Sequence, residues 1–188
     1  WYSAEGPGTG LSTELQGTAI YMCWYVYDES GQPVWYVSTA SHDDASAYVG
    51  TLLSCNGWPI GSSQSNLTCQ EAGNVALSFS GDTLTMDWTM GAKSGSESMT
   101  RFLWGESHPA SLDGWWYDPA HEGMGVFFEN RGDAPYFGWF NYRNDSSSQW
   151  WAATGTFADD SQTFSGTMIQ AKDGQVPGGA YKAPEATT

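Results

Sequence analysis

Residues 1–40 of the chain read WYSAEGPGTGLSTELQGTAIYMCWYVYDESGQPVWYVSTA, and residues 116–155 repeat this pattern at a constant offset of 115 positions. Twelve of the forty positions are identical, and most of them are aromatic residues or glycines. The identical pairs are Trp1/Trp116, Tyr2/Tyr117, Gly8/Gly123, Gly10/Gly125, Glu14/Glu129, Gly17/Gly132, Ala19/Ala134, Tyr21/Tyr136, Trp24/Trp139, Tyr27/Tyr142, Trp35/Trp150 and Thr39/Thr154. Aromatic rings and glycines govern packing and chain turning. The repeat is therefore more informative about the fold than about any chemical activity.

Residues 19–27, AIYMCWYVY, show what kind of fold this is. Alternate side chains of a strand point to opposite faces, and here both faces are apolar. Such a strand is normally covered on both sides, by a barrel interior plus a packing partner or by a bound ligand. Period-two alternation bounded by Gly, Asn, Asp and Ser recurs along the chain, whereas helical spacing is rare. The sequence therefore predicts an all-β fold of antiparallel meander or barrel-like units.

The expected organisation is one full unit followed by half of a second. Strands are predicted over residues 11–16, 19–27, 34–40, 47–53, 75–79, 83–90, 98–104, 124–130, 134–142, 149–155 and 163–170. The chain divides into a full β unit (1–104), a linker (105–114), a partial second repeat (115–171) and a flexible tail (172–188). The half unit has two unpaired edges, so it either joins the first unit in one sheet or barrel or pairs with another molecule.

The charge balance restricts the partners. Twenty-one acidic residues against six basic ones give a net charge of −15. Binding to nucleic acid depends on Lys and Arg displacing counterions, so nucleic acid is excluded as the default partner. No apolar run is long enough to cross a bilayer as a helix.

The cysteines indicate the compartment. Cys55 and Cys69 bracket a loop rich in Gly, Pro, Ser and Asn, and a disulfide between them is predicted. This bridge implies an oxidising compartment, and with the low Lys content it indicates an extracellular, cell-surface or periplasmic protein. Cys23 lies inside a predicted strand and is interpreted as a buried thiol.

The abundance of aromatic residues suggests a binding surface. Eleven Trp in 188 residues exceed the usual need of a core, although core packing stays the simpler interpretation of any single ring. Flat rings on a rigid sheet suit the apolar faces of sugars. The residues expected to contact a ligand are Trp24, Trp35, Tyr36, Trp139, Trp150 and Trp151.

Two segments resemble a known family. The motif GWWYDPAHEGMGVFFE at residues 114–129, followed by GWFNY and QWWAATG, is similar to tryptophan- and tyrosine-rich repeats of secreted and surface proteins of Gram-negative bacteria. Residues 1–104 are similar over their whole length, with Arg101 at the basic position that closes the pattern. Gly6-Pro7 and His121-Glu122 depart from it. The resemblance implies an exported β module and no particular activity.

Candidate reactive groups are few. Glu14 and Glu129 are the only carboxylates at identical positions, and a glycosidase would need a second carboxylate about 5 to 10 Å away. Asp118 and Glu122 could serve in the second copy, but their counterparts Ser3 and Pro7 could not. The carboxylates are therefore expected to accept hydrogen bonds from a turn, an Arg or a Tyr. His42-Asp43-Asp44 and His121-Glu122 match no zinc or EF-hand spacing, so neither a metal nor a cofactor is expected.

The sequence thus favours a non-enzymatic module that recognises glycans or builds a surface assembly, with carbohydrate or its own sheet edges as partners. The alternative is a small barrel that carries an apolar ligand against Trp24 and Trp139. A glycoside hydrolase is the third possibility.

Overall fold

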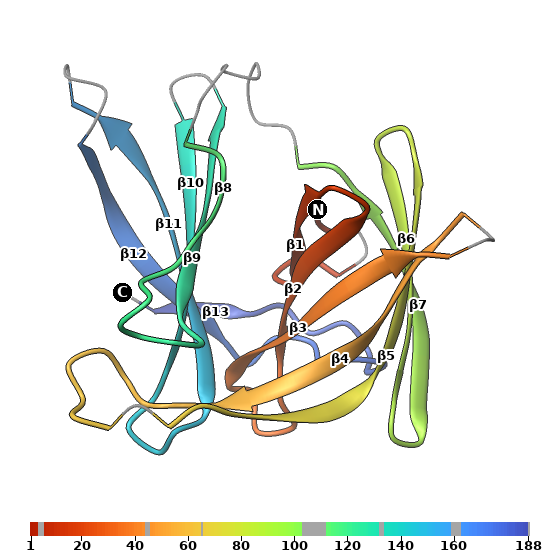
Figure 1. Cartoon of the computed structure of the whole chain (residues 1–188), viewed down its shortest axis with the longest axis horizontal. Helices are drawn as coiled ribbons and strands as arrows, with labels where there is room; N and C mark the ends of the chain where they lie inside the picture. The colour runs from red at the N-terminus through yellow and green to blue at the C-terminus, as the bar shows by residue number, and fades with distance from the viewer. Residues whose placement is uncertain are drawn as a thin grey trace.

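The computed structural model describes residues 1–3, 6–43, 46–64, 66–102, 112–131, 134–158 and 163–187. These residues form thirteen strands and no helix, arranged as two antiparallel sheets (Figure 1). Accordingly, the described part of the chain holds no helix of the length and apolarity that a membrane span requires. The all-β prediction is confirmed.

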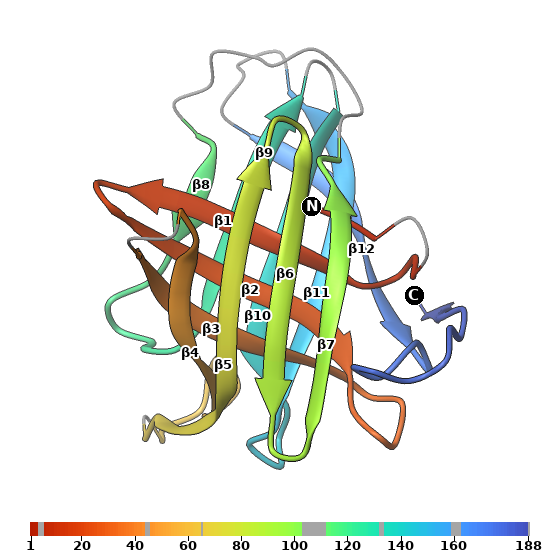
Figure 2. The same ribbon diagram turned by 90° about the vertical axis from the view of Figure 1, so that its right-hand side faces the viewer.

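The first sheet is a meander of seven strands in chain order (Figure 2). They are β1 (Gly10–Gln16), β2 (Ala19–Tyr27), β3 (Pro33–His42), β4 (Tyr48–Asn56), β5 (Thr68–Ser80), β6 (Thr83–Met90) and β7 (Lys93–Thr100). Its two outer strands are linked through the start of the chain. Tyr2 exchanges backbone hydrogen bonds of 2.9 and 3.0 Å with Thr100 of β7, while the Trp1 nitrogen donates to Leu11 O of β1. The N-terminal residues thus bridge the two outer strands of the sheet, which curls into a barrel.

The barrel interior is filled with side chains. Twelve buried apolar residues form one cluster: Leu11, Ile20, Met22, Trp24, Val26, Leu52, Val75, Leu77, Leu84, Met86, Trp88 and Met99. In β2 the residues that join this cluster alternate with Cys23, Tyr25 and Tyr27, which join a second cluster outside the barrel. The prediction that β2 is covered on both faces is confirmed, and both covers are protein.

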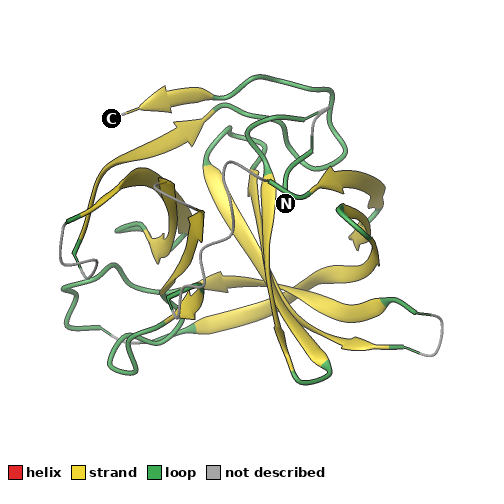
Figure 3. Cartoon of the chain, turned by 90° about the horizontal axis from the view of Figure 1, so that it is seen from above, coloured by secondary structure: helices red, strands yellow, loops and turns green. Residues whose placement is uncertain are grey.

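The second sheet has six strands, in the order β13-β12-β11-β10-β9-β8. They are β8 (Gly114–Trp116), β9 (Gly125–Arg131), β10 (Ala134–Tyr142), β11 (Ser148–Phe157), β12 (Phe164–Lys172) and β13 (Glu185–Thr187). Seen from above, this sheet curls beside the barrel without closing (Figure 3). Of the arrangements left open by the sequence, one continuous sheet is thus wrong, because the two sheets are separate and pack against each other.

The predicted disulfide is present. Cys55 and Cys69 face each other across β4 and β5 with their Cα atoms 4.1 Å apart, and their bond closes the base of the 57–67 loop. Cys23 is a buried free thiol, as interpreted from the sequence, and burial raises its pKa well above the ordinary value. A disulfide of this kind is compatible with a secreted or periplasmic protein.

Several elements differ from their predicted bounds. β5 begins at Thr68, before the predicted residue 75, and β7 begins at Lys93 because a two-residue turn at Gly91 replaces the longer turn expected there. Residues 103–111, which include most of the expected linker and the end of the predicted strand 98–104, lie outside the described residues. In the segment 172–188, β13 pairs with β12, and the Asp173 nitrogen donates to Gly31 O.

Candidate functional site

The two sheets meet through an aromatic cluster. Tyr25 of β2 stacks on Phe140 of β10, with ring centroids 4.8 Å apart and an interplanar angle of 25°. Trp150 packs edge-on to Tyr25 at 5.9 Å, and Trp35 packs edge-on to Phe140 at 6.3 Å. Each sheet thus contributes one stacked ring and one indole to the same contact. The two stacked rings are 115 positions apart in the sequence, and so are the two indoles.

The indoles also make hydrogen bonds that cross between the sheets. Trp35 Nε1 donates to the carbonyl oxygens of Gln149 at 3.1 Å and Asn141 at 3.4 Å. Trp150 Nε1 donates to Val26 O at 3.3 Å. Asn141 and Val26 are also 115 positions apart, so the Trp35–Asn141 and Trp150–Val26 contacts are reciprocal. A buried indole N–H needs such an acceptor, which fixes how the sheets are oriented.

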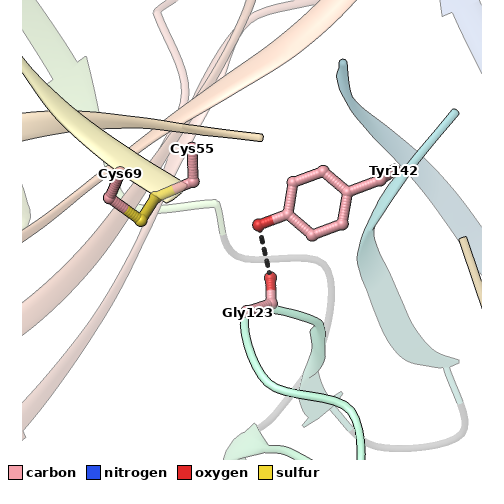
Figure 4. The surroundings of a disulfide bond; sticks show 4 residues. All are labelled: Cys55, Cys69, Gly123 and Tyr142. Atoms are coloured by element: carbon pink, nitrogen blue, oxygen red, sulfur yellow. Dashed lines mark hydrogen bonds between the residues drawn. A yellow bond between two sulfur atoms is a disulfide. The ribbon is translucent and has the colours of Figure 1, made fainter. Parts of the chain in front are cut away.

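A tyrosine at the end of β2 and a tyrosine at the end of β10 make the same hydrogen bond, each within its own unit. The Tyr27 hydroxyl donates to Gly8 O, and the Tyr142 hydroxyl donates to Gly123 O, both at 3.0 Å. Figure 4 shows the second of these bonds beside the Cys55–Cys69 disulfide. Burial raises the pKa of both phenols, so both stay protonated donors at neutral pH.

A glycine from the opposite unit lies against each of these rings. A Cβ added to Gly57 would come within 2.4 Å of the Tyr142 ring, and one added to Gly174 within 2.1 Å of the Tyr27 ring. The Gly57 nitrogen also donates to Ser146 O at 3.1 Å. The disulfide therefore holds the strand ends from which a loop reaches the second sheet.

A groove of about 900 Å³ lies between the barrel and the second sheet. Trp1, β1 and the chain after β7 form one wall, and parts of β9, β10 and β11 form the other. Its aromatic lining consists of Trp1, Tyr2, Tyr25, Tyr48, Phe79, Phe102, Phe127, Tyr136 and Trp150. Phe102 is 47% exposed and Phe79 is 37% exposed, so ring surface is accessible to a ligand there.

The two repeated carboxylates both line this groove, together with Asp113 and Arg101. Glu14 accepts a hydrogen bond of 2.6 Å from the Trp115 nitrogen and one of 2.7 Å from Gln16 Nε2. The prediction that Glu14 binds a turn, an Arg or a Tyr is wrong. Its carboxylate accepts a hydrogen bond from a strand amide of the other sheet. Burial raises the pKa of Tyr136 to about 12, so its phenol is neutral at physiological pH.

The six residues predicted to bind a ligand fall into three pairs. Trp24 and Tyr36 pack together at the barrel core, with ring centroids 6.1 Å apart. Trp35 and Trp150 are buried in the aromatic cluster between the sheets, where Trp150 also lines the groove. Trp139 and Trp151 face each other across β10 and β11 and are half-buried.

The six residues predicted to bind a ligand do not lie in one site. Trp24 and Trp139, which the carrier hypothesis puts in one cavity, lie in different units. The most exposed rings of the groove, Phe79 and Phe102, were not selected from the sequence. Phe102 directly follows Arg101, the residue at the basic position that closes the repeat pattern.

The candidate metal ligands are also dispersed. His121 Nδ1 lies 2.8 Å from Asp118 Oδ2, and the His42 ring packs edge-on to Tyr48. Among the residues that the structure describes, no three His, Cys, Asp or Glu side chains gather as a metal site would require. Asp44 lies outside those residues.

Comparison with known proteins adds no relative: no family model, no curated protein and no solved structure matches the chain. The resemblance to tryptophan- and tyrosine-rich repeats therefore stays a prediction. Any function has to be argued from the groove and the surfaces themselves.

Proposed function

We propose that the protein is a non-enzymatic, exported recognition module, built from two related β units, that binds a neutral glycan in the groove between its sheets. The observation that carries this proposal is the composition of the groove. Accessible Phe rings lie beside carboxylates and hydroxyl groups, in a space of about 900 Å³ that accommodates a short oligosaccharide. Rings can stack on the apolar face of a sugar while the polar groups accept its hydroxyl hydrogens.

The charge of the protein selects among glycans. A net charge of −15 disfavours sulfated or uronic-acid chains, because the surface potential repels anions before they reach the groove. Three carboxylates, of Glu14, Asp113 and Glu129, line the groove itself, and Arg101 is the cation among its lining residues. The ligand is therefore a neutral sugar chain.

Glu14 supports a binding role over a catalytic one. Its carboxylate is held by two donors, one of them a backbone amide of β8, which suits a fixed acceptor better than a group that must gain and lose a proton. Under this proposal the carboxylates position the sheets and accept hydrogen bonds from the ligand.

Calorimetric titration with a panel of neutral oligosaccharides tests the proposal. At least one member is expected to bind, and Phe102→Ala is expected to weaken that binding about tenfold or more by removing a stacking ring. Trp116→Ala is the matched control, because this ring is 51% exposed and lies outside the groove.

Three results would contradict the proposal. These are a panel in which nothing binds, equal losses in the two variants, and hydrolysis of a bound glycan that disappears in Glu129→Gln. Uptake of lipophilic dyes without glycan binding would favour the carrier hypothesis instead.

A further inference from the structure

Two hydroxyl groups lie side by side at the floor of the groove. Ser12 of β1 and Tyr25 of β2 both line the groove, and a hydrogen bond joins their hydroxyl oxygens. The two side chains are only 6% and 7% exposed. Because the pair is buried and hydrogen-bonded, both oxygens are held in fixed positions beside the space that a ligand would occupy.

This pair has hydrogen-bonding capacity for a further partner. Two hydroxyls carry two hydrogens, and the bond between them uses one. Among the residues that the structure describes, neither hydroxyl makes a second hydrogen bond. Burial raises the pKa of Tyr25 well above its ordinary value, so the phenol keeps its hydrogen at neutral pH. The pair can therefore donate one hydrogen to an oxygen in the groove and can also accept one.

A third hydroxyl lies close to this pair. Tyr136 of β10 also lines the groove, and Gly138 follows it on the same face of the strand. A Cβ added to Gly138 would lie 3.3 Å from the Tyr25 hydroxyl oxygen and 3.7 Å from the Tyr136 hydroxyl oxygen. Both phenols thus approach the same glycine. We call Ser12, Tyr25 and Tyr136 the hydroxyl cluster.

The second unit shows that the fold does not require hydroxyls at the two paired positions. Ser12 and Tyr25 correspond to Phe127 and Phe140 at the offset of 115, and β9 pairs with β10 in the same register as β1 with β2. Both Phe rings are buried in the aromatic cluster between the sheets. Since apolar groups can replace both members of a hydrogen-bonded pair at little cost in stability, packing alone does not account for the hydroxyls of Ser12 and Tyr25.

We propose that the hydroxyl cluster is the specificity-determining subsite of the groove and binds one hydroxyl group of a neutral sugar. This inference rests on the proposed glycan-binding function. A sugar hydroxyl both donates and accepts a hydrogen bond, and the cluster offers both capacities at fixed positions, whereas the carboxylate of Glu14 only accepts. A site built around one hydroxyl rejects an analogue that lacks it, because the buried partners of that hydroxyl are then left unpaired.

Calorimetric titration with cello-, xylo-, manno- and malto-oligosaccharides identifies the bound sugar, and Ser12→Ala/Tyr25→Phe then tests the subsite. We expect this double variant to bind that sugar about tenfold or more weakly. Its midpoint of urea unfolding should stay unchanged, because both members of the pair are removed together. Tyr136→Phe removes the third hydroxyl and should also weaken binding. The matched control is Tyr142→Phe, which removes a phenol hydroxyl of the same aromatic cluster outside the groove and should leave binding unchanged.

Deoxy forms of the bound sugar show which of its hydroxyls the cluster contacts. One deoxy form is expected to bind the wild-type protein about tenfold or more weakly than the parent sugar. The double variant should bind that deoxy form and the parent sugar equally, because the contact is already lost from the protein side. A pair that only stabilised the fold would not produce this dependence on a single sugar hydroxyl.

The outcomes that overturn the subsite differ from those that overturn the glycan site. If the double variant binds the sugar as tightly as the wild type while Phe102→Ala weakens binding, the groove binds glycans and the subsite is wrong. The subsite is also wrong if every deoxy form loses the same affinity in the wild type and in the double variant. A lower midpoint of urea unfolding with unchanged affinity would assign the pair a structural role instead. A panel in which no sugar binds overturns the glycan site and the subsite together.

Discussion

At the scale of single residues, the interface between the two sheets depends on Gly57 and Gly174. These glycines lie against the rings of Tyr142 and Tyr27. Gly57→Ala would place a methyl group within 2.4 Å of the Tyr142 ring, so the loop or the ring must move. We expect this substitution to lower the free energy of unfolding by about 1–3 kcal/mol, the usual cost of overpacking. Denaturant unfolding measures it. In a Tyr142→Ala background the cost should shrink, and an equal cost in both backgrounds would show that the ring contact is unimportant.

The buried phenols make stability sensitive to alkaline pH. Burial raises the pKa of Tyr27 and Tyr142 in the folded state above the ordinary value of 10.0. A raised pKa favours folding in the protonated form, so this stabilisation is complete below about pH 10 and is lost as the pH rises through the folded-state values. We expect the melting temperature to fall steeply above about pH 10. Tyr27→Phe should make the fall shallower, and a profile identical to the wild type would contradict this assignment.

The residue scale also shows which site residues the sequence could indicate. Trp35 and Trp150 are each followed by a second aromatic residue in a predicted strand, so the two rings of each pair must point to opposite faces. One ring of each pair is buried between the sheets. The sequence could not show that the buried face would meet another sheet instead of a ligand. Phe79 and Phe102 were missed because their exposure depends on how Trp1 and Tyr2 close the barrel, which is a long-range property.

At the scale of elements, the disulfide joins β4 to β5 where the sequence predicts no strand. Cys55→Ala/Cys69→Ala should lower the free energy of unfolding by about 2–4 kcal/mol, mainly because the unfolded chain regains freedom. Urea unfolding of the variant measures this loss, and wild-type protein in reductant serves as the comparison. An unchanged midpoint would show that the β4–β5 pairing does not need the covalent bond.

The same elements explain which strands could be predicted. β2 was predicted at its full extent because both of its faces are apolar and Gly17 and Asp28 bound it. The first residues of β5 were not predicted to form a strand, because Thr68, Gln70 and Glu71 are exposed and polar. Only their pairing with β4 makes them a strand. β13 was missed for a similar reason: its three residues become a strand by pairing with β12.

At the scale of the whole molecule, the groove exists only if the two sheets hold a fixed relation. The stacked Tyr25 and Phe140 and the indole hydrogen bonds of Trp35 and Trp150 provide that relation. Trp35→Ala should therefore destabilise both sheets together, by about 3–5 kcal/mol, because it removes a buried ring shared by both. Hydrogen exchange resolved by strand measures this, and loss of protection confined to the first sheet would argue against a shared core.

Differential scanning calorimetry tests the central claim, that the barrel and the half-barrel form one body with a groove fixed between them. The claim predicts a single transition whose calorimetric and van't Hoff enthalpies agree, and in Trp35→Ala this transition moves to lower temperature without splitting. Two separate transitions in the wild-type protein, one for each sheet, would contradict it.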